Sequence, residues 1–105
     1  RKRRVLFKFG VIYQTKLGQL KEIPIIVSEI IKQESGAILD RVHFASYGNF
    51  SLDFEVVYYV NSRDYNRYMD IQQEINFKMK EEFEKREIEF AYPTQTLFLS
   101  KENGR

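Results

Sequence analysis

The chain has 105 residues, of which 43% are hydrophobic and 15% aromatic, a composition that supports a folded core and excludes intrinsic disorder. Its 17 basic and 15 acidic residues leave a net charge of +2, which predicts no strong general affinity for polyanions. Cysteine is absent, which excludes disulfides and thiolate chemistry, and no apolar run approaches the roughly 20 residues that a transmembrane helix needs. We therefore expect a single soluble domain or a soluble piece of a longer chain.

The pattern predicts a strand over residues 4–13 and a helix over residues 15–35. In the first stretch, large side chains alternate along one face: Val5, Phe7, Phe9, Val11 and Tyr13. In the second, apolar residues recur at helical spacing: Leu17, Leu20, Ile23, Val27, Ile30 and Ile31. We expect Thr15 to cap this helix and Gly36 to follow its end. Pro24 either kinks the helix or lies in the first turn of a helix that begins near Ile23.

A β-hairpin is predicted next. Residues 38–47 form its first strand, with Val42 and Phe44 facing inward. Gly48 and Asn49 form the turn, because both tolerate a positive φ. The second strand is the clearest pattern in the chain, since one face is apolar throughout: Phe50, Leu52, Phe54, Val56, Tyr58 and Val60.

The last third predicts a long helix and two short extended pieces. Asp64 caps the helix, whose buried stripe consists of Tyr68, Ile71, Ile75, Met79 and Phe83. A short strand follows from Ile88 to Tyr92, and Pro93 ends it because proline removes a ladder donor. Residues 94–99 then resume a strand-like pattern.

The element order predicts the fold class. A β-α-β-β-α-β order indicates an α+β protein, a ferredoxin-like sandwich with two helices on one face of the sheet and a short extra C-terminal strand after Pro93. We expect residues 1–93 to form this domain and residues 94–105 to form a C-terminal strand and tail. Because the fold hosts many functions, function has to be argued from particular residues.

No residues form a catalytic, cofactor-binding or metal-binding constellation. His43 is the only histidine and is expected at the surface. Without cysteine, a second histidine or suitably spaced carboxylates, the sequence predicts no metal site, no cofactor and no enzyme. The carboxylates of residues 81–84 point around a helix and form a solvated face.

RNA recognition is the alternative to weigh, because RNA-binding modules use the same strand order with aromatic side chains on the open face of the sheet. Here the alternation sends Phe7, Phe9, Phe54 and Tyr58 to the helix-covered face. The open face presents Asp53 and Glu55, which repel phosphates, and Tyr59 as a lone aromatic. We expect no nucleic-acid partner, and a free-standing RNA-binding or ligand-binding module is kept as the alternative.

Three stretches in register resemble the cytoplasmic C-terminal domain of the MscS family of mechanosensitive channels: residues 10–24, 52–60 and 64–99. The most specific pieces are residues 73–76 and 90–96. The resemblance implies a heptameric membrane channel that opens under bilayer tension and releases solutes during osmotic downshock. It implies a pore made by transmembrane helices upstream, with this domain shaping a vestibule with side portals on the cytoplasmic side of the membrane.

The resemblance also assigns two groups of candidate residues. One is an inter-subunit strand that closes a small barrel with its neighbours: Thr94, Gln95, Thr96, Leu97, Phe98 and Leu99. The alternative is that Pro93 marks a bulge at the edge of this domain's own fourth strand. The other group is a basic segment placed near the portals, where it would bias passing ions: Arg1, Lys2, Arg3 and Arg4. The competing interpretation of that segment is a solvated chain end.

Two positions depart from the family pattern. Glu87 stands where the resemblance suggests a glycine at the helix exit, and a left-handed backbone there costs on the order of 1 kcal/mol. Phe50 lies in the hairpin, where the family more often has small polar residues, and is expected to add an exposed apolar contact.

Overall fold

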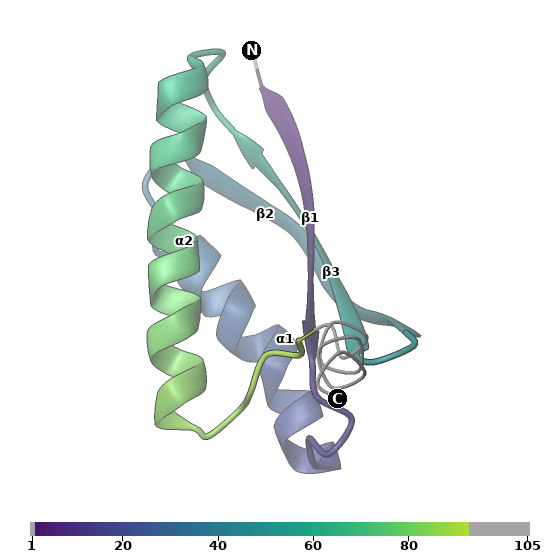
Figure 1. The fold of residues 1–105 in the computed structure, drawn as a ribbon. Coiled ribbons are helices and arrows are strands. Elements are labelled where there is room, and N and C mark those ends of the chain that lie inside the picture. The colour runs from purple at the N-terminus through teal and green to yellow at the C-terminus, as the bar shows by residue number, and fades with distance from the viewer. Residues whose placement is uncertain (1, 93–105) are drawn as a thin grey trace, which may run out of the picture.

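The chain folds into two layers, a twisted antiparallel sheet and a pair of helices packed against one of its faces (Figure 1). The computed structural model describes residues 2–92. Its elements are β1 Arg3–Val11, α1 Leu17–Lys32, β2 Ala37–Tyr47, β3 Leu52–Val60 and α2 Tyr65–Lys85. The strand order is β1-β3-β2, with antiparallel pairing throughout. This arrangement confirms the α+β ferredoxin-like class.

The predicted fourth strand is reduced to a single bridge, which corrects the expectation of a regular strand over residues 88–92. Phe90 pairs with Val11 at the outer edge of β1. Two backbone hydrogen bonds flank this pair: Ile12 N to Glu89 O at 3.1 Å, and Ala91 N to Gly10 O at 3.0 Å. The segment therefore lies where a ferredoxin-like fourth strand belongs, beside β1.

Two register shifts in β2 decide which of its residues face the core. They lie between Leu39 and Arg41 and between Phe44 and Ser46, so one residue is inserted at each place relative to β3. Val42 is buried as predicted. Phe44 points the same way and stacks on Phe54 at 5.3 Å, but it is 37% exposed, so its predicted burial is only partial.

The start of α1 differs from the prediction. Lys16, not Thr15, is the N-cap, because the Thr15 hydroxyl donates to the Ile12 carbonyl at 2.6 Å instead. Pro24 lies inside the helix, which continues through it to Lys32. A start near Ile23 is therefore wrong, and the helix tolerates the loss of one backbone hydrogen bond.

Both helices are followed by a residue with a positive φ. Gly36 has φ 91°, as expected of the glycine after α1. Glu87 has φ 58°, so the position where the family pattern suggests glycine does adopt the left-handed conformation with a side chain attached. The backbone after α2 therefore carries a steric cost that the backbone after α1 avoids.

Replacing Glu87 with glycine is expected to raise the free energy of unfolding by about 0.5–1 kcal/mol, because glycine has no Cβ to crowd a left-handed backbone. Chemical denaturation measures the change. Glu74→Gly is the control, since Glu74 is exposed in the middle of α2 and its replacement is expected to cost about 1 kcal/mol. Destabilisation by both variants would contradict the left-handed assignment.

The hairpin between β2 and β3 needs Gly48 for space, not for a positive φ. A Cβ on Gly48 would lie 2.5 Å from the Asp53 Oδ2 atom. The loop is closed by a 2.7 Å hydrogen bond from the Gly48 N–H to the Ser51 carbonyl, and β3 begins only at Leu52. Phe50 thus lies outside the strand and is 41% exposed, which corrects its predicted place on the buried face and agrees with its expected exposure in the hairpin.

Candidate functional surfaces

The basic residues at the start of β1 lie on different faces of the sheet. Arg1 lies outside the described residues. The Lys2 Nζ atom sits 5.9 Å from the centre of the Tyr59 ring, on the open face of the sheet. Arg4 pairs in register with Tyr59 and is exposed on the same face. Arg3 points to the opposite, helix-covered face, so these residues do not form one cluster.

Arg3 is a packing residue that joins β1 to α2. Its guanidinium carbon lies 5.8 Å from the Tyr65 ring and 5.3 Å from the Tyr68 ring. Its Nη2 donates to the Arg63 carbonyl at 3.3 Å, and its Nε is buried without an acceptor. Cation–π contacts of this kind stabilise most when they are partly desolvated. Sequence reasoning missed this contact, although two tyrosines three residues apart on a helix share a face.

The open face of the sheet combines exposed apolar and cationic side chains. Leu6 is 47% exposed and Ile38 is 43% exposed, on either side of the central strand β3. Arg4 and Lys8 flank Leu6 along β1. Tyr59 is the single aromatic residue of the strands on this face among the described residues, so the structure offers the RNA-binding alternative no stacking platform.

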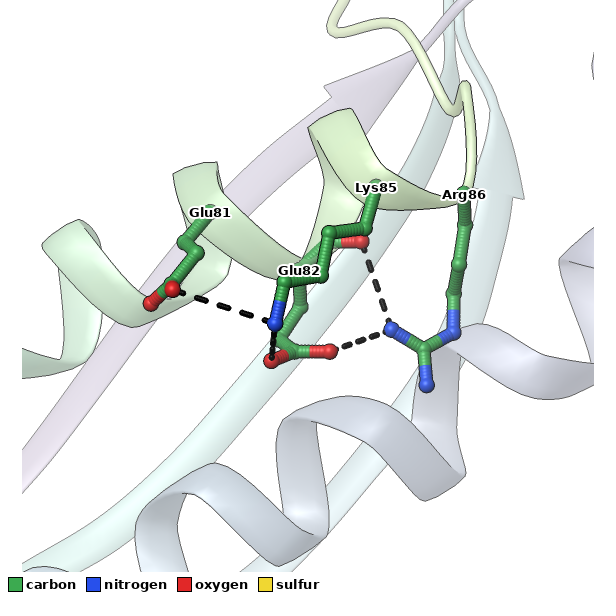
Figure 2. Close-up of polar contacts among 4 residues, drawn as sticks. All are labelled: Glu81, Glu82, Lys85 and Arg86. Atoms are coloured by element: carbon green, nitrogen blue, oxygen red, sulfur yellow. Dashed lines mark hydrogen bonds and ion pairs between the residues drawn. The ribbon is translucent and has the colours of Figure 1, made fainter.

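The end of α2 carries a network of charges (Figure 2). Arg86 bonds the Glu82 carboxylate, and the Lys85 Nζ lies 3.8 Å from Glu81 and 3.5 Å from Glu82. The hydrogen bond from Arg86, with attraction from Lys85, lowers the pKa of Glu82 against the opposing effect of desolvation. These contacts link residues one turn apart on a solvated helix surface, as the sequence predicts for residues 81–84.

Gln19 connects the beginning of α1 to the end of α2. Its Oε1 accepts from the Lys16 N–H at 3.1 Å, and its Nε2 donates to the Arg86 carbonyl at 3.1 Å. One amide thus satisfies a free donor at one helix end and a free acceptor at the other. Gln19 stands at the N3 position of α1, where glutamine often accepts from the N-cap N–H, and this is the local signal that sequence reasoning missed.

A hydrogen-bonded chain runs from the core to the surface of α2. The buried Tyr58 hydroxyl donates to Gln72 Oε1 at 2.7 Å, and Gln72 Nε2 donates to Asn76 Oδ1 at 3.0 Å. Burial raises the pKa of Tyr58, and Tyr68 and Glu34 raise it further. The neutral phenol is therefore part of the folded state.

This raised pKa predicts a loss of stability in alkali. Above about pH 10 the unfolded chain releases the Tyr58 proton while the folded chain retains it, so the free energy of unfolding falls as the pH rises. Tyr58→Phe is expected to cost about 1 kcal/mol at neutral pH through the lost hydrogen bond, and to lack this alkaline loss. Urea denaturation between about pH 8 and pH 11 checks it. If the free energies of unfolding of the native protein and of Tyr58→Phe differed by the same amount at every pH, that result would contradict the raised pKa of Tyr58.

Other described features are surface or structural. His43 is exposed, as predicted. Among residues 2–92, no three His, Cys, Asp or Glu side chains are grouped so that they could hold a metal ion. Neither helix of that range is long and apolar enough to cross a membrane. The candidate interface residues Thr94–Leu99, and the domain boundary at Pro93, lie outside the described residues.

The fold and these surfaces define a small ferredoxin-like α+β domain whose polar clusters serve packing and helix ends. The family model described as "Mechanosensitive ion channel MscS, C-terminal" matches residues 5–90. The chain belongs to the MscS family of mechanosensitive ion channels.

Three longer proteins are similar to this chain over most of its length. "Small-conductance mechanosensitive channel MscMJ" of Methanocaldococcus jannaschii is 41% identical over 103 residues, which are 97% of this chain and 29% of the relative. "Uncharacterized MscS family protein" of Aquifex aeolicus is 39% identical over 95% of this chain and 28% of its own length. "Large-conductance mechanosensitive channel MscMJLR" of M. jannaschii is 34% identical over 90% of this chain and 27% of its own. The chain thus spans less than a third of each relative.

Proposed function

We propose that this chain is the cytoplasmic domain that shapes and assembles the vestibule of a tension-gated channel acting in osmotic downshock. The observation that carries the proposal is the family match over residues 5–90, together with relatives that are named as mechanosensitive channels. Because the chain spans less than a third of those relatives, the activity belongs to a longer subunit. The role of this domain in that subunit is structural, and the subunits associate with one another as a heptamer.

The end of the described chain supports an inter-subunit role for Thr94–Leu99. If the register set by the hydrogen bond from Ala91 N to Gly10 O continued along β1, position 93 would pair with Lys8. An uninterrupted ladder needs an N–H there, and Pro93 has none. The register at the edge of β1 therefore favours a segment that leaves this sheet and pairs with neighbouring subunits, which removes exposed strand edges.

A charge bias at the portals is proposed for Arg1, Lys2 and Arg4. The exposure of Lys2 and Arg4 on the open face supports it, whereas the packing of Arg3 between two tyrosines assigns that residue to stability. In the full-length channel, replacing these three with glutamine and keeping Arg3 is expected to shift the reversal potential in a salt gradient. Replacing Lys21 and Lys32, which are exposed on α1, is the control. An unchanged reversal potential would remove the portal assignment.

Osmotic shock and patch-clamp recording test the channel function directly. The full-length protein that carries this domain is expressed in bacteria that lack their own mechanosensitive channels. We expect it to restore survival after downshock and to give pressure-activated currents in excised membrane patches. A full-length protein that reaches the membrane as an oligomer, yet gives neither survival nor current, would contradict the proposal.

A further inference from the structure

We propose that the two residues inserted in β2 prevent its outer edge from accepting another strand, so that copies of the chain do not join along this edge. β2 is the last strand in the order β1-β3-β2, so one of its sides faces no other described strand. Within residues 2–92, no backbone group of residues 38–47 forms a hydrogen bond outside the ladder with β3. The inference does not depend on the channel function, because it concerns only which edge of the sheet stays unpaired.

The composition of β2 by itself favours pairing with another strand. β2 has 11 residues without proline or lysine, whereas protected edge strands are often very short or carry those residues. Its two formal charges cancel, because Arg41 Nη1 lies 3.1 Å from Asp40 Oδ2. Residues 42–47 carry no formal charge, and those from His43 to Tyr47 are all exposed. Uncharged segments of this length with aromatic and β-branched side chains and no proline are typical of strands that pair between chains.

β1, at the opposite edge of the sheet, is protected in other ways. It carries Arg3, Arg4 and Lys8 and no acidic residue, and like charges on an edge strand disfavour pairing with a second copy. The end of β1 also bonds the segment around Phe90. Along the described part of the chain, β2 has neither an excess of one charge nor a covering segment. Its inserted residues are therefore the feature that protects it.

Asp40 and Ala45 are the inserted residues, because the neighbours of each pair with consecutive positions of β3. In a regular strand, the N–H and C=O groups that point outward recur every second residue. Each insertion shifts this repeat by one residue, so a straight incoming strand loses its register there. The longest regular stretch of β2 is the four residues from Arg41 to Phe44. A ladder of that length without a connecting turn is too short to hold two chains together.

Deleting Asp40 and Ala45 together in the full-length protein tests the inference. The nine residues of β2 that remain match the nine residues of β3 one for one, so every existing pair is kept. We expect the purified variant to form concentration-dependent species of about twice the native mass or more in sedimentation velocity, because the outer edge becomes regular. The deletion also removes the partner of Arg41, and the added positive charge opposes association. Association would therefore come from the regular ladder.

The control combines Asp40→Asn with Ala45→Ser, which keeps both inserted residues and removes the same charge. It is expected to sediment as the native protein does. Circular dichroism and thermal unfolding verify that each variant is folded. If the double deletion does not fold, deletion of Ala45 alone replaces it. That deletion leaves the charge unchanged and makes β2 regular from Arg41 to Tyr47.

Hydrogen–deuterium exchange measures the state of the edge directly, in the native full-length protein and in the variant. Alternate amides of β2 point away from β3, whereas β3 is bonded by a strand on each side. In the native protein, we expect these outward amides to exchange at least about tenfold faster than the amides of β3. In the associated species of the double deletion, the same amides are expected to become protected.

Four results would overturn the inference. The first is a folded deletion variant that keeps the native mass, and the second is association of the Asp40→Asn, Ala45→Ser control, which would make charge the cause. The third is protection of every β2 amide in the native protein, since the edge would then already be paired. The fourth is association of the deletion variant without new protection in β2. The absence of tension-gated current in the native protein would count against the proposed function and leave this inference intact.

Discussion

Replacing Phe83 with alanine is expected to lower the free energy of unfolding by about 3–5 kcal/mol, the largest effect of any prediction made here. Phe83 is fully buried near the end of α2. Its ring stacks on Phe90 at 4.9 Å and meets Phe9 edge-on at 5.7 Å. Truncation leaves a cavity where α2, β1 and the segment after α2 come together.

Phe77→Ala is the matched control for this prediction. It removes the same side chain from the same helix at a position that is 60% exposed, so the change in the unfolding free energy is expected to stay within about 0.5 kcal/mol. Denaturant-induced unfolding of both variants measures the contrast. Similar losses for the two would mean that the core at the end of α2 is not packed as described.

Phe83 also contacts the segment that follows α2, so its replacement is expected to affect that segment. Phe90 follows the left-handed Glu87 and forms the bridge to Val11 of β1. Its stacking on Phe83 therefore helps to hold the segment around Phe90 against the edge of β1. Phe83→Ala is therefore expected to loosen this segment as well as the helix that carries Phe83.

Arg3→Ala is expected to lower the free energy of unfolding by about 1–2 kcal/mol, the second largest effect. The change removes two cation–π contacts, to Tyr65 and Tyr68, each contributing roughly 0.5–1 kcal/mol. It also removes the hydrogen bond to the Arg63 carbonyl. Arg3→Lys is expected to recover part of the loss, because lysine keeps the charge but lacks the planar group that stacks on the rings.

Arg4→Ala is the control, since Arg4 is the next residue, has the same charge and is exposed. Its replacement is expected to change stability by less than about 0.5 kcal/mol. Equal effects at positions 3 and 4 would point to net charge as the cause and would contradict a specific role for Arg3.

The sequence by itself determined the order of the elements from β1 to α2, and it determined the family. The alternation from Leu52 to Val60 defined β3, and the stripe from Ile71 to Phe83 with Asp64 before it defined α2 and its N-cap. The left-handed backbone at Glu87 was indicated by the family resemblance, which suggests a glycine there, and not by the glutamate itself. Such features depend on neighbours within a few residues, so the pattern along the chain is enough to predict them.

Only the tertiary structure decided the features that depend on distant partners. The insertions in β2 exist relative to β3, so they are invisible in β2 alone. The burial of Arg3 depends on groups some 60 residues away, and Gln19 reaches the carbonyl of Arg86, 67 residues along the chain. The fourth strand is reduced to the Val11–Phe90 bridge, and this likewise depends on where the end of α2 lies relative to β1. Contacts of such long sequence separation leave no periodic signal, because either residue alone fits several environments equally well.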